Sequence, residues 1–145
     1  MDEESGSETK EALVSAFAEF GGNSLRDIWL FDQSDYEMLF LREDVADKLE
    51  AVDVAKFIDN ERFGFITQDT YDQLYYATYQ YTVRGFDDFE QFRMFFDDDA
   101  DDDRHVGVFA SLDQQPNGYD YESLYKHVTD IASGYTVPVI SSDTE

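Results

Sequence analysis

The chain has 145 residues, of which 42% are hydrophobic and 17% aromatic, enough to bury the core of one domain. Because it has no cysteine, disulfides, cysteine-ligated zinc, iron–sulfur clusters and thiol catalysis are excluded. With 34 acidic residues against 10 basic ones, the formal net charge is −24, which argues against direct nucleic-acid binding because such binding needs a basic surface.

The N-terminal sequence and the hydropathy of the chain bear on its location. The opening stretch MDEESGSETKEAL has neither a basic region nor an apolar one, so it is not expected to be a signal peptide. No apolar run approaches the ~20 residues that span a bilayer, so membrane insertion is not expected. We therefore expect a cytoplasmic protein.

A first helix is predicted over residues 7–20, after a polar lead at residues 1–6. Ser5 and Glu8 have the S-x-x-E spacing of a capping box. The apolar stripe with helical spacing consists of Leu13, Phe17 and Phe20. The glycine pair at 21–22 supplies a left-handed stop.

Two short β-prone runs follow, at Ile28–Phe31 and Tyr36–Leu41, and predict a hairpin. Residues 32–35, of sequence Asp-Gln-Ser-Asp, suit the turn between them. Both runs are apolar at nearly every position, so we expect burial on two faces, at least in part.

Helical spacing returns at Glu43, which with Asp44 places negative charge where a helix N-terminus favours it. The apolar face consists of Val45, Leu49 and Val52. We predict one helix from Glu43 to about Asn60. The connection after it is expected to pack its apolar side chains inward, namely Phe63, Phe65 and Ile66.

Three strands are predicted next, as a meander. Side chains alternate in the tyrosine-rich stretch 74–83, in residues 91–96 and again in residues 106–112. In the first of these, Tyr75, Tyr79 and Tyr81 are expected on one face. Residues 85–88 make a turn.

The last predicted element is a helix that Asp120 caps and Gly134 ends. Its apolar residues repeat at helical spacing and are Tyr121, Leu124, Val128 and Ile131. Residues 135–145 are expected to form a loosely attached tail.

This order of elements predicts an α+β fold over residues 7–134, as a single domain. A single antiparallel five-stranded sheet with helices packed on it satisfies the patterns, in the order α-β-β-α-β-β-β-α. The order resembles that of roadblock and profilin-like modules, and the resemblance implies pairing of two copies through a helix and a sheet edge.

The acidic residues recur in nearly every segment, as a distributed coat rather than a tail. At molar salt the Debye length falls to about 3 Å, so most of the repulsion within such a coat is screened. This coat, together with the stretch SLRDIWLFDQSDYEMLFLREDVADKL, resembles small uncharacterised proteins of halophilic archaea. The resemblance implies a habitat more than an activity.

The most acidic segment is FFDDDADDDRH, at residues 95–105. An EF-hand loop needs glycine at its sixth position and glutamate at its twelfth. A loop starting at Asp97 has Asp102 and Val108 there, and one starting at Asp99 has Arg104 and Ala110. We therefore expect a solvated turn between two strands, with no specific metal site and only diffuse contact with solvent cations.

Neither a catalytic nor a cofactor-binding motif stands out. The patterns G-x-S-x-G, G-x-G-x-x-G, H-E-x-x-H and the P-loop are missing from the sequence. The two histidines, His105 and His127, are expected in a polar strand start and on a helix surface. We expect neither an enzyme nor a bound cofactor.

The function expected is that of a non-catalytic regulatory or protein-interaction module in the cytoplasm of an extreme halophile. The residues expected to carry the contact are Trp29, Phe31, Tyr75, Tyr79 and Tyr81, although each residue type is also typical of a core. The second apolar face of the hairpin predicts a homodimer, unless the first helix covers that face within one chain.

The alternative function is that of a small-molecule-binding sensor with an aromatic-lined pocket. A cavity lined by Phe92, Met94 and tyrosines would favour this alternative, and a filled core with an exposed apolar patch would favour the interaction module.

Overall fold

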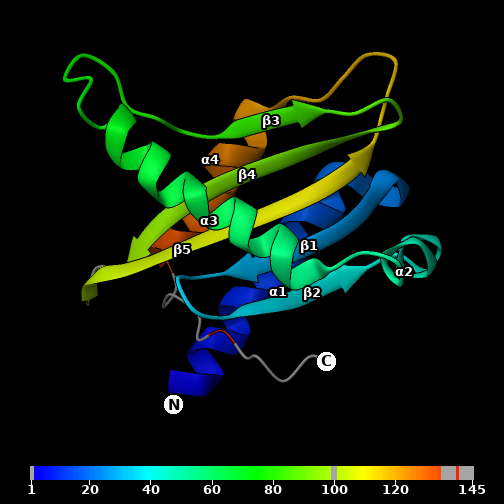
Figure 1. Ribbon diagram of the computed structural model, residues 1–145, viewed down its shortest axis with the longest axis horizontal. Helices are drawn as coiled ribbons and strands as arrows, with labels where there is room; N and C mark the ends of the chain where they lie inside the picture. The colour runs from blue at the N-terminus through cyan, green and yellow to red at the C-terminus, as the bar shows by residue number, and fades with distance from the viewer. Residues whose placement is uncertain (1, 99–100, 135–139, 141–145) are drawn as a thin grey trace.

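The computed structural model describes residues 2–98, 101–134 and 140, and these form an α+β fold (Figure 1). A single five-stranded antiparallel sheet is combined with four α-helices and one short 3₁₀ helix, as predicted for the fold class. The strands are β1 (Leu25–Phe31), β2 (Tyr36–Leu41), β3 (Thr82–Gly85), β4 (Phe89–Asp98) and β5 (Asp101–Asp113). The helices are α1 (Asp2–Gly21), η1 (Gly22–Ser24), α2 (Glu43–Leu49), α3 (Val54–Tyr71) and α4 (Tyr121–Gly134).

The strand order in the sheet is β2-β1-β5-β4-β3, so the first hairpin joins the later meander through β1 and β5. Helix α3 runs across one face of the sheet, and α1 and α4 pack together on the opposite face (Figure 1). The sheet is therefore the middle layer of three, and each face carries its own core.

Strand β1, which lies between β2 and β5, is buried along its whole length, as the apolar hairpin predicts. Ile28 and Leu30 belong to the core under α1 and α4, and Trp29 and Phe31 to the core under α3. The alternation follows from the period of two in a strand. Because α3 covers the second face within the same chain, the hairpin needs no second subunit for that purpose.

Helix α1 ends where predicted but starts earlier. Gly22 has φ of 55°, the left-handed conformation that stops the helix. The helical backbone begins at Asp2, so Ser5 lies inside the helix and the predicted capping box does not mark its start.

The prediction of a single helix from Glu43 to about Asn60 was wrong, because the chain breaks after Leu49. Val52 N–H donates to the carbonyl of Leu49 at 2.9 Å in a turn. Asp53 then caps a new helix, since its Oδ1 accepts from Lys56 N–H at 3.2 Å. Two helices, α2 of 7 residues and α3 of 18, thus replace the single predicted one.

The connection predicted after residue 60 was also wrong, since α3 continues to Tyr71. Phe65 packs inward as expected, 5.5 Å from the ring of Phe31 between centroids. Phe63 and Ile66 lie on the opposite side of the helix, 64% and 65% exposed. The helical period places them there, since each follows a buried residue, Glu61 or Gly64, by two positions, about half a turn.

Most of the predicted tyrosine strand is not a strand. Residues 74–81 form a connection, and only β3 pairs with β4, over four positions. Tyr79 packs in the core under α3 whereas Tyr81 packs in the core under α1 and α4, so the two do not share a face.

The remaining predictions for β4, β5 and α4 are confirmed. Phe92 and Met94 alternate with Gln91 and Arg93, and the residues of β5 from 106 to 112 alternate likewise. Asp120 Oδ1 accepts from Ser123 N–H at 3.2 Å, which caps α4.

The acidic segment connects β4 to β5, whose backbones pair as far as Asp98 and Asp101. The tip of this connection, and the predicted tail apart from Ile140, lie outside the described residues. Ile140 is buried in the core under α1 and α4.

Candidate ligand pocket

The sheet face under α3 carries one row of polar residues among aromatic ones. Asp27 on β1 pairs with Ser111 on β5, and Ser111 pairs with Gln91 on β4. All three side chains are buried. The next row along the strands holds Trp29 and Phe109 as paired neighbours. The register of three strands therefore sets a polar strip beside an aromatic one.

A pocket lies over this polar row, with a volume of about 280 Å³. The break between α2 and α3 lies at this pocket, since Val52 of the turn and Val54 of α3 both line it. Its walls are apolar side chains of the sheet, α2, the turn and α3, namely Trp29, Val45, Leu49, Val52, Val54, Phe57, Phe89 and Phe109. Its polar residues are Arg26, Asp27, Lys48, Gln91 and Ser111.

The aromatic wall is a stack of three rings. Phe109 stacks with Trp29, at 6.4 Å between ring centroids and 13° between planes, and with Phe57, at 5.8 Å and 27°. Such near-parallel rings present flat surfaces and favour flat partners.

Asp27 is held on the pocket floor by Ser111. Its Oδ1 accepts from the backbone N–H of Ser111 at 2.9 Å and from the Ser111 hydroxyl at 2.8 Å. Burial raises the pKa of the Asp27 carboxyl, and the hydrogen bonds from Ser111 and Trp29 oppose that rise. The raised pKa makes this a carboxyl whose charged form is costly in its place.

Arg26 closes the floor toward Asp113, at the end of β5. Its Nε donates to Ser111 Oγ at 3.2 Å, and its guanidinium carbon lies 4.3 Å from the centre of the Phe89 ring. Its Nη1 lies 3.6 Å from Asp113 Oδ1, an ion pair. Arg26 thus contacts Ser111, Phe89 and Asp113 of this chain.

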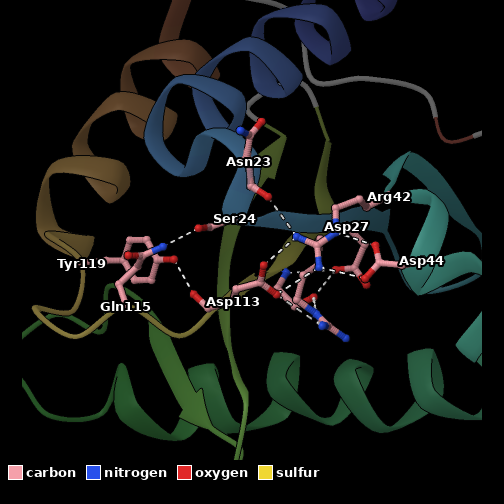
Figure 2. Close-up of polar contacts among 10 residues, drawn as sticks. Asn23, Ser24, Asp27, Arg42, Asp44, Asp113, Gln115 and Tyr119 are labelled. Carbon is pink, nitrogen blue, oxygen red and sulfur yellow. Dashed lines mark hydrogen bonds and ion pairs between the residues drawn. The ribbon is translucent and has the colours of Figure 1, made fainter.

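Arg42 fastens α2 to the sheet next to the pocket, as Figure 2 shows. Its guanidinium donates to both carboxylate oxygens of Asp113, at 2.7 and 3.1 Å, and to both of Asp44, at 2.6 and 3.1 Å. It also donates to the carbonyl of Asn23 at 2.9 Å. These hydrogen bonds lower the pKa of both carboxyls and raise that of Arg42. Because Asp44 lies in the first turn of α2, Arg42 fixes the helix that supplies one pocket wall.

The same region of Figure 2 shows how the end of β5 is held. Tyr119 O–H donates to the carbonyl of Asp113, and Gln115 Nε2 donates to Ser24 Oγ at 2.5 Å. Asp113, which accepts hydrogen bonds from Arg42, is therefore also held by Tyr119 through its backbone carbonyl.

Gln91 completes the floor and differs from its neighbours in the row. Its Oε1 is buried and has no hydrogen-bond partner among the described residues. A buried acceptor without a partner costs on the order of 1–3 kcal/mol, so such groups are rare in folded proteins unless a bound molecule satisfies them.

A second buried polar cluster lies farther along α3. Glu61 Oε1 accepts from Arg84 at 2.6 Å and from Arg93 at 3.0 Å. The cluster joins α3 to β3 and β4, and Gly64 lets the helix approach, since a Cβ there would lie 2.5 Å from the Phe95 ring. Because none of these residues lines the pocket, the cluster reads as an anchor for α3.

The residues predicted to carry contact are scattered. Trp29 and Phe31 are buried within this chain and present no contact surface. Tyr79 and Tyr81 are partly buried in opposite cores, whereas Tyr75 is 96% exposed in the connection after α3. Trp29 alone lines the pocket.

Phe92 and Met94, named as lining of a possible sensor cavity, fill the core on the other face. Among the described residues, no group of three or more His, Asp or Glu side chains is arranged to hold a metal ion. The side chains of the acidic segment at 97–104 lie outside that description. The His105 ring packs on Phe65, and His127 is exposed on α4.

Comparison with known proteins places the chain in a family. The model of the domain of unknown function DUF7522 matches residues 11–133. The chain belongs to this family. No curated protein and no solved structure matches it. In the described part of this DUF7522 chain, no helix is both long and apolar enough to cross a bilayer.

The match spans all the strands and α4, and with them every residue of the pocket. Sequence reasoning did not find Asp27, Gln91 or Ser111, because each is an ordinary polar residue within an alternating strand. The signal in the sequence is that these polar residues occupy strand positions that would otherwise be apolar. It can be used only when α3 is known to cover that face of the sheet.

Proposed function

We propose that the chain is a non-catalytic regulatory module that binds a small molecule between α2, α3 and the sheet. The pocket over the polar row carries the proposal: aromatic walls, a floor of buried polar groups, and one acceptor among them without a partner. Binding sites for small molecules combine apolar walls with a few placed polar groups in this way. The structure thus supports the sensor more directly than the interaction module.

A fragment screen by ligand-observed NMR at molar KCl tests the proposal. Binders are expected in the parent and are lost in Val52→Trp, which places a large ring at the exposed mouth of the pocket. Val83→Trp is the matched control, since Val83 is exposed on β3 and does not line the pocket. Binders that survive Val52→Trp, or a library without binders, would contradict it.

Protein contact is the second candidate, and a different observation favours it. Phe63 and Ile66 are exposed on the outer side of α3, and Tyr75 and Tyr76 are exposed in the connection that follows. Exposed large apolar groups are typical of contact surfaces. We call Phe63 and Ile66 the α3 outer pair, and propose it as the place where a protein partner, a second copy included, would bind.

The environment we propose is the salt-filled cytoplasm of an extreme halophile. The net charge of −24 supports it, because a compact domain with that charge is opposed by its own repulsion in dilute buffer and relieved of it at molar salt.

A further inference from the structure

The chemistry of the pocket narrows the class of ligand. We infer that the ligand is an uncharged, planar molecule of one or two fused rings that donates an N–H or O–H hydrogen bond to Gln91 Oε1. The inference rests on the proposed function, since it concerns the same pocket.

The size and the shape come from the walls. An engineered apolar cavity of about 150 Å³ holds one benzene. The pocket here has about 280 Å³, which suits a ring system of roughly twice that size. Phe109 stacks with both Trp29 and Phe57, and a planar ligand would extend this stack from Trp29 or Phe57, which both line the pocket.

The polar residues of the pocket floor indicate that the ligand carries a hydrogen-bond donor. Asp27 Oδ1 already accepts two hydrogen bonds from Ser111, and the Ser111 hydroxyl accepts one from Arg26 while donating one to Asp27. Gln91 Oε1, in the same row, is buried without a partner among the described residues, as is Glu61 Oε2, whose residue does not line the pocket. Gln91 lines the pocket, but its Oε1 is closed to water as the side chain stands, so a ligand donor reaches it by turning the Gln91 amide toward the pocket. The bond then satisfies a buried group, which is the arrangement that discriminates most strongly against an analogue lacking the donor.

The absence of charge follows from the surroundings. A charged ligand would lose its hydration on entering an apolar pocket. The lining holds groups of both signs, Asp27 against Arg26 and Lys48, so neither an anion nor a cation finds a one-sided electrostatic gain to offset that loss. A neutral ligand avoids the loss of hydration.

Indole and benzofuran test the donor, because they share shape and differ in a ring N–H. Calorimetry at molar KCl is expected to show indole binding about tenfold tighter than benzofuran, the usual value of one buried hydrogen bond. In Gln91→Leu, which keeps the volume and removes the acceptor, the two should bind alike, and Val52→Trp should abolish both. Indole-3-carboxylate tests charge and is expected to bind roughly tenfold more weakly than indole.

Each other outcome has a distinct meaning. Equal binding of indole and benzofuran to the parent overturns the hydrogen bond from the ligand to Gln91. Tighter binding of indole-3-carboxylate than of indole overturns the inference that the ligand is uncharged. In both cases the pocket is still a binding site if Val52→Trp blocks binding. Failure of all three probes overturns the ring class, and the proposed function then falls only if the fragment screen also finds no binder that Val52→Trp removes.

Discussion

The hydroxyl of Ser111 donates to Oδ1 of Asp27 at 2.8 Å and accepts from Nε of Arg26 at 3.2 Å, which joins β1 to β5 through three buried side chains. Their sequence separations of 84 and 85 residues make this contact a consequence of sheet register rather than of local structure. A hydroxyl that serves as donor and acceptor at once has no substitute in an apolar residue.

Ser111→Ala is therefore expected to destabilise the fold by about 1–3 kcal/mol, because Asp27 loses one donor and Arg26 loses its acceptor. Urea unfolding at molar KCl measures the change. Ser15→Ala, at an exposed position on α1, is the control and should stay within about 0.5 kcal/mol of the parent. Equal values for the two variants would contradict the role given to Ser111.

The raised pKa of Asp27 predicts how the free energy of unfolding depends on pH. Its folded pKa is raised above the usual 3.8 by burial, so the folded state holds the proton more tightly than the unfolded state. Its contribution to the free energy of unfolding should fall as pH rises from about 3.8 to the folded pKa and stay constant above it.

In Asp27→Asn this component disappears. The stability of the parent minus that of the variant should therefore decline across the same pH window, which thermal unfolding at a series of pH values measures. A difference that rises with pH there would mean that Asp27 is stabilised as a carboxylate in the folded state.

Arg42 is expected to fix α2 through geometry as well as charge. Arg42→Lys keeps the charge but cannot engage both oxygens of Asp44 and of Asp113 at once. Amide hydrogen exchange in α2 should speed up while that in α4 stays unchanged. Lys126→Gln removes an exposed ion pair with Glu122 on α4 and serves as the control, for which no change in α2 is expected.

The ion pair between Arg42 and Asp113 also predicts how stability changes at low pH. Arg42 holds the pKa of Asp113 below its usual value, so the pair contributes stability above about pH 3.8 that is lost as pH falls through the folded pKa. Arg42→Lys should shrink this loss in thermal unfolding, and an unchanged acid limb would contradict the coupling.

The sequence predicted the strands well where side chains alternate with a period of two and the strand pairs along its length with a neighbour. The faces of β1, β4 and β5 follow directly from their residues, because Ile28, Phe92 and Val108 recur at strand spacing with their neighbours. The strand prediction failed at the tyrosines, whose β propensity was high but whose pairing was limited by the length of α3 and the short overlap with β4.

The pocket could not be predicted from local sequence patterns, because it also depends on how the strands pair. Asp27, Ser111 and Gln91 become neighbours only through register across three strands, and a single sequence does not contain that register. The break at Asp53 is visible as a possible cap, yet the continuous apolar spacing of Val45, Leu49 and Val52 concealed it.

Salt provides a test of the acidic coat as a whole. The midpoint of thermal unfolding should rise steeply between low and molar KCl, because screening removes repulsion among 34 acidic residues. Repeating the series in an equal ionic strength of NaCl separates screening, which is common to both salts, from a specific effect of potassium. A midpoint that stays flat in both salts would remove the halophile proposal.

The last prediction concerns self-association. The original reason for a homodimer, an uncovered hairpin face, is gone because α3 covers Trp29 and Phe31. An exposed apolar surface remains on the α3 outer pair, so a dimer would form there. Light scattering of the parent at molar KCl is then expected to give twice the chain mass of 16.8 kDa in the micromolar range.

Replacing Phe63 and Ile66 together by serine should return the mass to that of one chain. Val83→Ser, at an exposed apolar position on β3, should leave the dimer intact. Both substitutions lie on the surface, so neither outcome depends on damage to a core. A parent mass of 16.8 kDa throughout would exclude self-association and leave the α3 outer pair to a different protein.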